Sequence, residues 1–205
     1  MPYSHVVFDF DGTLVDSLAN SIAAFRRIAP RFKLNLDLDL ATARTIPTRD
    51  LFRQMGVSFW KLPRILRAFQ EEAAQDAPNL KLFDGIADAL AELAARGVQL
   101  GILSSNREDA IRTCLRANGV EDRFAFVVGY PKLFGKAKAL RRILKAERID
   151  RESFLYVGDE ARDVQAAKRA KVASAAVTWG FHAEELLRAA EPKYLLRSPA
   201  ELNHI

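Results

Sequence analysis

Two aspartates, Asp9 and Asp11, follow a short apolar run and stand directly before a Gly-Thr pair. An apolar run of β type is expected to be buried, so a carboxylate at its end needs a partner or a function. At the carboxyl end of a strand, both side chains can reach a crevice. Two carboxylates this close repel each other unless a cation lies between them or one holds a proton. Turn and capping roles are the structural alternative; the pattern favours Mg²⁺ together with an aspartyl nucleophile and a neighbouring acid/base.

The other predicted strands also end in polar side chains. These are Ser104, Ser105 and Asn106 after the second strand, Lys136 after the third, and Asp159, Glu160 and Asp163 after the fourth. Carboxylates suit Mg²⁺, whereas hydroxyls, free backbone N–H groups and an ammonium suit a phosphate. Each residue has an ordinary alternative as a helix cap or a solvated helix-start residue. Their joint occurrence at strand ends favours a phosphate and metal site.

The periodicity of the chain alternates between strands and helices. Strands are predicted at residues 5–8, 98–103, 124–128, 153–157 and 172–177, with a last edge strand at 194–196. Helices are predicted between them at 85–95, 106–117, 136–146, 161–170 and 183–189. This alternation predicts an α/β protein with a parallel sheet covered by helices on both faces.

The segment between the first and second strands carries only helical patterns. They cover residues 18–29, ending before Pro30, and residues 38–43, 49–55 and 62–74. We therefore expect a core domain made of residues 1–16 and 84–205. Residues 17–83 are expected to form a small, all-helical cap domain.

Composition narrows the classes of function. The 205 residues carry a formal net charge of +5, but the basic residues are scattered, so no nucleic-acid partner is expected. A single cysteine, Cys114, rules out an internal disulfide and is interpreted as a buried thiol. We find no leader pattern and no apolar run that could span a bilayer. The expected setting is the cytoplasm, with no membrane partner, and the oligomeric state is left open.

The four separated motifs resemble those of the haloacid dehalogenase-like hydrolases. The motifs are Asp9-Phe10-Asp11-Gly12-Thr13, Ser104-Ser105, Lys136, and Gly158-Asp159-Glu160 with Asp163. The helical insert resembles the cap of the phosphoglycolate phosphatase-like branch. The resemblance covers essentially the whole chain and implies a Rossmann-like core with a cap inserted after the first strand.

The resemblance also implies a role for each motif residue. Asp9 would be the nucleophile that forms an aspartyl-phosphate, and Asp11 would be the general acid/base. Asp9, the main-chain carbonyl of Asp11, and Asp159 would hold Mg²⁺. The remaining motif residues would bind phosphate (Ser104, Ser105 and Lys136) or orient the metal waters and the lysine (Glu160 and Asp163).

Three assignments remain open at this point. Lys132 competes with Lys136 as the phosphate-binding lysine, and Ser105 competes with Ser104 as the phosphate hydroxyl. In the cap, Arg44, Thr45 and Arg49 form a candidate substrate-facing loop, where an arginine would bind a second anionic group such as a carboxylate. A solvated arginine in a helix connection is the alternative, slightly favoured for Arg44 and for Arg49. For His182, a surface position is favoured over one facing the site.

The expected function is Mg²⁺-dependent hydrolysis of a small phosphomonoester, with phosphoglycolate as the first candidate. Asp11 favours phosphoester chemistry, because the dehalogenase and phosphonate-cleaving branches lack this second aspartate. A sugar-phosphate mutase of the same superfamily keeps both aspartates and is the enzymatic alternative. A non-catalytic phosphate-binding or partner-binding protein is the alternative of another class.

Overall fold

The computed structural model describes residues 2–37, 39–58, 60–130, 132 and 135–205. Its centre is a six-stranded sheet in the order β3-β2-β1-β4-β5-β6, in which every neighbouring pair is parallel. The strands are β1 (His5–Phe8), β2 (Gln99–Ser104), β3 (Phe124–Gly129), β4 (Phe154–Gly158), β5 (Ala173–Val177) and β6 (Tyr194–Leu196). This confirms the predicted parallel α/β sheet, including its edge strand.

The short strand β1 lies in the middle of the sheet. It pairs in register with β2 on one side and with β4 on the other, so that Phe8 lies between Ile102 and Val157. Parallel strands end at the same edge of a sheet. Asp9 after β1, Ser104 at the end of β2 and Asp159 after β4 are therefore brought to one edge, although up to 150 residues separate them in sequence.

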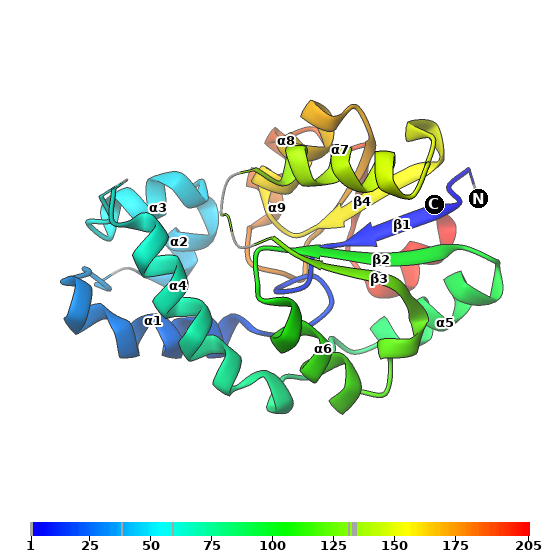
Figure 1. Ribbon diagram of the computed structural model, residues 1–205. Helices are drawn as coiled ribbons and strands as arrows, with labels where there is room; N and C mark the ends of the chain where they lie inside the picture. The colour runs from blue at the N-terminus through cyan, green and yellow to red at the C-terminus, as the bar shows by residue number, and fades with distance from the viewer. Residues whose placement is uncertain (1, 38, 59, 131, 133–134) are drawn as a thin grey trace.

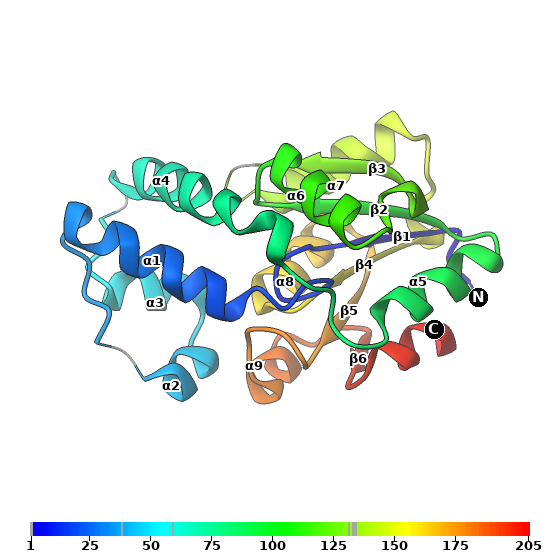
Figure 2. The ribbon, with the colours of Figure 1, turned by 90° about the horizontal axis from the view of Figure 1, so that it is seen from below.

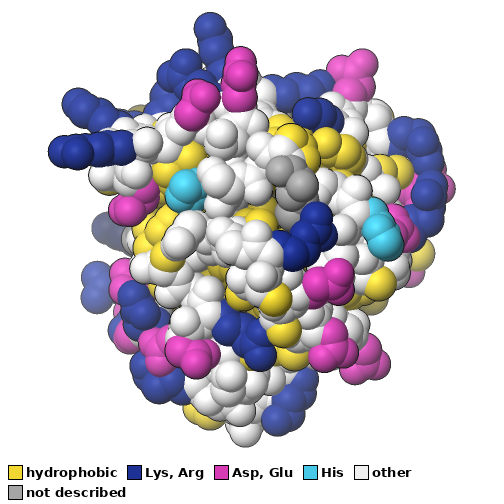
Figure 3. All heavy atoms as spheres, turned by 90° about the vertical axis from the view of Figure 1, so that its right-hand side faces the viewer, with side chains coloured by type: hydrophobic (Ala, Val, Ile, Leu, Met, Phe, Trp, Pro, Cys, Tyr) yellow, Lys and Arg dark blue, Asp and Glu magenta, His cyan; other side chains and the backbone are white. Residues whose placement is uncertain are grey.

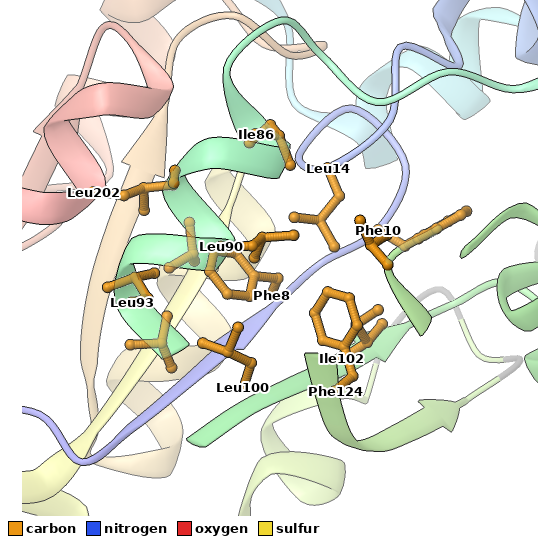
Figure 4. Packing of buried hydrophobic residues seen from close by; sticks show 14 of the residues in the cluster. Phe8, Phe10, Leu14, Ile86, Leu90, Leu93, Leu100, Ile102, Phe124 and Leu202 are labelled. Carbon is orange, nitrogen blue, oxygen red and sulfur yellow. The ribbon is translucent and has the colours of Figure 1, made fainter. Parts of the chain in front are cut away.

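Helices cover both faces of the sheet. One face packs against α5 (Ile86–Ala95), α6 (Glu108–Ala117) and the 3-10 helix η4 (Pro199–His204), through Phe8, Leu90 and Leu100 among others (Figure 4). The other face packs against α7 (Lys136–Ala146) and α8 (Ala161–Ala170), while α9 (Glu184–Ala189) packs beside α8. Three short 3-10 helices complete this part: η1 (Ala77–Asn79), η2 (Glu121–Arg123) and η3 (Arg151–Ser153).

Four helices lie beyond the carboxyl ends of the strands, away from the two chain termini (Figures 1 and 2). They are α1 (Leu18–Phe32), α2 (Leu40–Thr45), α3 (Thr48–Gln54) and α4 (Leu62–Gln75). They form small apolar clusters of their own, in which Phe25 stacks on Phe69 with ring centroids 4.4 Å apart. These clusters are separate from the two that flank the sheet. The exact domain boundaries at residues 17 and 83 remain a prediction.

Helix α1 does not end before Pro30, so that expectation is wrong. The helix continues to Phe32 and closes on Lys33, whose backbone is left-handed. Proline in the last turn costs one backbone hydrogen bond but does not force the chain out of the helix at once. Burial of Ile28 with Phe32 and Leu34 in one cluster keeps the last turn helical.

The charge distribution on one end of the surface and the burial of Cys114 match what the sequence predicts. At the end of the molecule away from α1–α4, acidic and basic side chains are mixed and the apolar areas between them are small (Figure 3). Cys114 is fully buried against the sheet. Within the described residues, we find no helix that is both long enough and apolar enough to cross a membrane.

Candidate active site

A buried lysine joins two buried aspartates at the carboxyl edge of the sheet. Lys136, the first residue of α7, places its Nζ 2.5 Å from Asp9 Oδ2 and 2.6 Å from Asp163 Oδ1. All three side chains are at least 96% buried. The ammonium also lies 5.6 Å from the ring centre of Tyr156, whose hydroxyl donates to the Leu103 carbonyl. Strand β4 therefore supports the lysine from beneath the site.

Burial and charge act against each other in this cluster. Burial raises the pKa of Asp9 to about 6, although the charge of Lys136 opposes that rise. Burial alone would lower the pKa of Lys136, but the charges of Asp163 and Asp9 outweigh it and hold that pKa well above its usual value. The lysine therefore stays charged beside a carboxylate that accepts a proton more readily than usual.

Asp11 lies further along the same loop, at the wall of a cavity. Its Oδ2 accepts a hydrogen bond from the Asn106 side-chain amide at 3.1 Å. Burial raises the pKa of Asp11, while hydrogen bonding to Ser17 and Asn106 partly opposes the shift. Asn106 itself is held by the buried Ser104, whose Oγ accepts from the Asn106 backbone N–H at 3.1 Å. The result is a carboxyl group that accepts a proton more readily than usual and faces the space in which a ligand would lie.

Asp159 occupies a niche built from two loops. Its Oδ1 accepts from Thr13 Oγ1 at 3.1 Å, and its Oδ2 accepts from the Phe181 backbone N–H at 2.7 Å. Gly12 and Gly180 pack so closely that a Cβ on either would overlap the Asp159 side chain. Burial and the neighbouring carboxylates Glu160 and Asp9 raise the pKa of Asp159 well above its usual value.

This acidic cluster fits a hard divalent cation. One carboxylate oxygen from each of Asp9, Asp159 and Asp163 lies within 4.8 Å of the others, and all three residues are buried. The two hydrogen-bond donors to Asp159 are neutral, so the repulsion that raises its pKa is relieved by a positive charge in the same space. Oxygen donors of this kind suit Mg²⁺.

A cavity of about 210 Å³ lies between this edge and helices α1, α3 and α4. Asp11, Ser105, Asn106 and Asp159 form the sheet side. Aromatic rings line much of the remainder: Phe25, Phe52, Phe69, Phe83, Trp179 and Phe181. A reacting group at Asp9 and Asp11 would therefore point away from the sheet into a small, largely apolar space.

Comparison with known proteins decides the family. The model of the haloacid dehalogenase-like hydrolases matches residues 6–177. A phosphoglycolate phosphatase of Synechococcus elongatus is 39% identical over 199 residues, covering 96% of this chain and 94% of that protein. The chain belongs to the haloacid dehalogenase-like hydrolase family. A second relative within this family, a phosphoglycolate phosphatase of Xylella fastidiosa, is 32% identical and covers 88% of this chain and 82% of its own.

The fold of this hydrolase agrees with solved structures. A crystal structure described as a predicted phosphatase from Clostridium acetobutylicum superposes with a TM-score of 0.86 at 24% identity, covering 100% of this chain and 98% of the other. The family model and the 39% identical relative confirm the expected family, its phosphoglycolate phosphatase-like branch and an enzyme of the phosphatase kind. The roles of individual residues remain predictions.

The two lysine candidates of the hydrolase lie in different places. Lys136 is buried between Asp9 and Asp163, whereas Lys132 is exposed with its ammonium 5.8 Å from the ring centre of Tyr130. Ser104 is buried and Ser105 is half-buried at the cavity wall. Leu38, the expected start of a helix in the insert, lies outside the described residues.

The predicted cap residues are not brought together around the cavity. Thr45 is exposed and its hydroxyl donates to the Thr42 carbonyl, while the exposed Arg49 lines a neighbouring cleft toward α8 that also includes Lys136. Arg44 does line the cavity, but its Nε and Nη2 donate to the carbonyls of Phe181 and Gly180 at 2.9 and 3.1 Å. A shared substrate-facing loop is therefore not what the geometry shows.

Glu160 and His182 form a second polar cluster where α3 meets the core. Glu160 pairs with Arg162 at 2.5 Å and accepts a hydrogen bond from Thr48. Burial alone would raise the pKa of Glu160, but the charge and hydrogen bond of Arg162 bring it down to about 2. His182 is fully buried here and accepts the Ala161 N–H at Nδ1, so the expected surface position is wrong. Sequence gives no sign of this burial, because the contacts come from α3 and the start of α8.

Two contacts of the site were not foreseen. Asn106 was noted among the polar residues after the second strand, but its hydrogen bond to Asp11 was not expected; α6 begins only at Glu108, and Asn106 turns toward Asp11. Gln70 of α4 donates from its side chain to the Ser105 carbonyl at 2.5 Å. Gly12 and Thr13 belong to the first motif, so the sequence places them near the site. Nothing in the sequence distinguishes Gln70 from a surface residue of α4.

Proposed function

We propose that this hydrolase is a Mg²⁺-dependent phosphatase that hydrolyses a small phosphomonoester, with phosphoglycolate as the leading substrate. The observation that carries the proposal is the buried group of Asp9, Lys136, Asp159 and Asp163 beneath the cavity wall that holds Asp11. The 39% identity to a phosphoglycolate phosphatase supports the choice of substrate. Residues 17–83 would act as the cap over the site.

Mg²⁺ would be held by the carboxylates of Asp9 and Asp159 and by the main-chain carbonyl of Asp11. Asp163, whose carboxylate lies in the same cluster, would help to orient the metal waters while it holds Lys136. When bound, the ion would neutralise part of the charge of the phosphoryl oxygens. Lys136 would contribute a second positive charge, so that an anionic nucleophile could approach an anionic phosphate.

In the first step, an Asp9 carboxylate oxygen attacks phosphorus and the bond to the leaving oxygen breaks. Asp11, protonated beforehand, gives its proton to that oxygen, so the product leaves as an alcohol. The raised pKa of Asp11 suits this role, and the Asn106 amide holds the carboxyl in place. The phosphoryl group is then covalently bound to Asp9.

In the second step, water releases the phosphoryl group. Asp11, now a carboxylate, takes a proton from the water as its oxygen attacks phosphorus, and Asp9 is regenerated. Ser104, the Ser105 backbone and Lys136 would hold the phosphoryl oxygens throughout. This sequence leaves each residue in its starting protonation state.

The cavity beside Asp11 favours a small leaving group. Its volume of about 210 Å³ lies below the roughly 300–1,000 Å³ that is typical of sites for drug-sized ligands. A phosphorylated two-carbon acid suits such a space better than a nucleotide does. We therefore expect a preference for the smallest phosphomonoesters.

The test is release of inorganic phosphate from phosphoglycolate in the presence of Mg²⁺, with EDTA as the metal-free control. A nucleoside monophosphate, a hexose phosphate, pyrophosphate and a hexose bisphosphate are compared with it. We expect kcat/KM to be highest for phosphoglycolate and activity to disappear with EDTA. Transfer of labelled phosphate to a second sugar would instead indicate a mutase, and no turnover of any ester would contradict the proposal.

Gly12→Ala tests the niche around Asp159. The added Cβ would overlap Asp159 Oδ2, and the backbone at Gly12 has a φ of +72°, which alanine adopts at a cost of about 1 kcal/mol. We expect the dissociation constant for Mg²⁺, measured by calorimetry, to rise by about tenfold or more, because the carboxylate must move.

Gly119→Ala is the matched control for this variant. Gly119 has a similar φ of +68°, but nothing lies within 4 Å of the position of its added Cβ. Its substitution should cost about the same free energy of unfolding from the positive φ alone, without the overlap at Asp159, and should leave Mg²⁺ affinity unchanged. Equal Mg²⁺ affinities in the two variants would contradict the placement of Asp159 at the metal.

A further inference from the structure

Arg44 connects the cap to the loop that follows β5. Its Nε and Nη2 donate to the carbonyls of Phe181 and Gly180, and its own carbonyl accepts from the Ala183 N–H at 2.9 Å. We infer that Arg44 is a positioning residue that holds this loop against Asp159, and that it is not a ligand of the substrate. The inference rests on the proposed function in so far as Asp159 holds the metal.

The loop that Arg44 holds is in direct contact with the metal carboxylate. The carbonyls that accept from Arg44 belong to Gly180 and Phe181, and the Phe181 N–H donates to Asp159 Oδ2 at 2.7 Å. Backbone packing at Gly180 leaves no room for a Cβ between the Gly12 carbonyl and Asp159. A shift of the loop would therefore change the direction in which the Asp159 oxygens point.

The N–H groups of Arg44 that are already hydrogen-bonded decide whether it positions the loop or binds the substrate. Arginine binds a carboxylate most strongly through two parallel N–H groups. In this structure Nε and Nη2, an adjacent pair of that kind, are directed at the two main-chain carbonyls. A substrate carboxylate would have to displace both hydrogen bonds, and the loop next to Asp159 would then be released.

The chain of contacts has a consequence for the metal. Residues that orient metal ligands commonly contribute about 10- to 100-fold in metal affinity. Arg44 acts on Asp159 through one intervening residue, so we expect the lower end of that range. Because Arg44 belongs to α2, the metal site is completed by a contact from outside the core.

Calorimetric titration of the metal-free protein with Mg²⁺ tests the inference, with Mn²⁺ as a second probe. Arg44→Ala should raise the dissociation constant of both ions by about tenfold. Arg44→Lys, which keeps the charge and a single donor nitrogen, should recover part of that affinity. At saturating Mg²⁺, the KM for phosphoglycolate should stay within about threefold of the wild-type value. Arg53→Ala, which removes an exposed arginine of α3, is the matched control and should leave metal affinity unchanged.

The outcomes separate this inference from the proposed function. Wild-type metal affinity in Arg44→Ala, together with a raised KM, would overturn the inference and return Arg44 to substrate binding. If Arg44→Ala fails to fold, the dissociation constant of Arg44→Lys decides in the same way. Metal binding without turnover of phosphoglycolate would reject the proposed substrate and leave the inference standing. A wild-type protein that binds neither ion would overturn both.

Discussion

Asp9→Asn should lose phosphatase activity, with kcat lower by about 10⁴-fold or more. The amide cannot attack phosphorus, so the covalent route is closed. The fold should survive, because Lys136 keeps its ion pair with Asp163 at 2.6 Å. The measurement is phosphate release from phosphoglycolate at saturating Mg²⁺, together with mass spectrometry of protein quenched in acid during turnover. Wild-type protein should carry one phosphoryl group on the peptide that contains Asp9.

Asp84→Asn is the matched control for this experiment. Asp84 is an exposed aspartate that lies outside the cluster, so its amide should leave both turnover and the labelled peptide unchanged. Near-wild-type turnover by Asp9→Asn, or a phosphoryl group found on a different peptide, would reject Asp9 as the nucleophile. Either result would leave the family assignment intact, since that rests on the whole chain.

The core of this hydrolase was predictable because its signals are local. A buried parallel strand is a short apolar run, and a covering helix has apolar residues at a period of 3.6. The sheet then brings the residues after β1, β2 and β4 to one edge, whichever segments separate them in sequence. The sequence alone therefore groups Asp9, Ser104 and Asp159.

Contacts between α1–α4 and the core could not be predicted in the same way. Gln70 to Ser105 and Arg44 to Gly180 are each a single polar contact across a packing interface, and no periodic pattern encodes such a pair. From sequence alone, an arginine near a phosphate site looks like a substrate ligand, whether its N–H groups are free or already hydrogen-bonded within the protein. Only the positions of the Phe181 and Gly180 carbonyls show that the N–H donors of Arg44 are already hydrogen-bonded.

The Glu160–Arg162 pair and the Asp9–Lys136–Asp163 group differ in how their negative charge is balanced. This difference decides which substitution lowers the stability most. Glu160 is neutralised by Arg162, and its pKa falls to about 2. Asp9 and Asp163 share one lysine, and the pKa of Asp9 is raised to about 6 despite that lysine. Removing Lys136 would therefore leave two buried carboxylates where even the native arrangement is short of positive charge.

Lys136→Met should lower both stability and activity. Breaking a buried ion pair by removing one partner costs about 3–5 kcal/mol, and methionine fills a similar volume without the charge. Activity should fall by about 10³-fold, because charge on the phosphoryl oxygens is no longer neutralised from this side. The measurements are urea unfolding in EDTA and phosphate release in Mg²⁺. Lys138→Met, which removes an exposed lysine of the same helix, is the matched control and should change neither.

The stability loss should depend on pH in a direction that the raised pKa of Asp9 determines. A carboxyl whose pKa is higher in the folded state binds its proton more readily when folded, so lowering the pH favours folding within that window. Without Lys136 the pKa of Asp9 rises above about 6, so the window extends toward neutral pH.

The difference in free energy of unfolding between wild type and Lys136→Met should therefore be largest at pH 8. This deficit should shrink toward pH 5, by up to about 1.4 kcal/mol per pH unit. Lys136 itself contributes no slope in this range, because its folded pKa lies well above its usual value and it stays charged throughout. A deficit that is constant across this range, or larger at pH 5, would show that Lys136 does not hold the charge of Asp9.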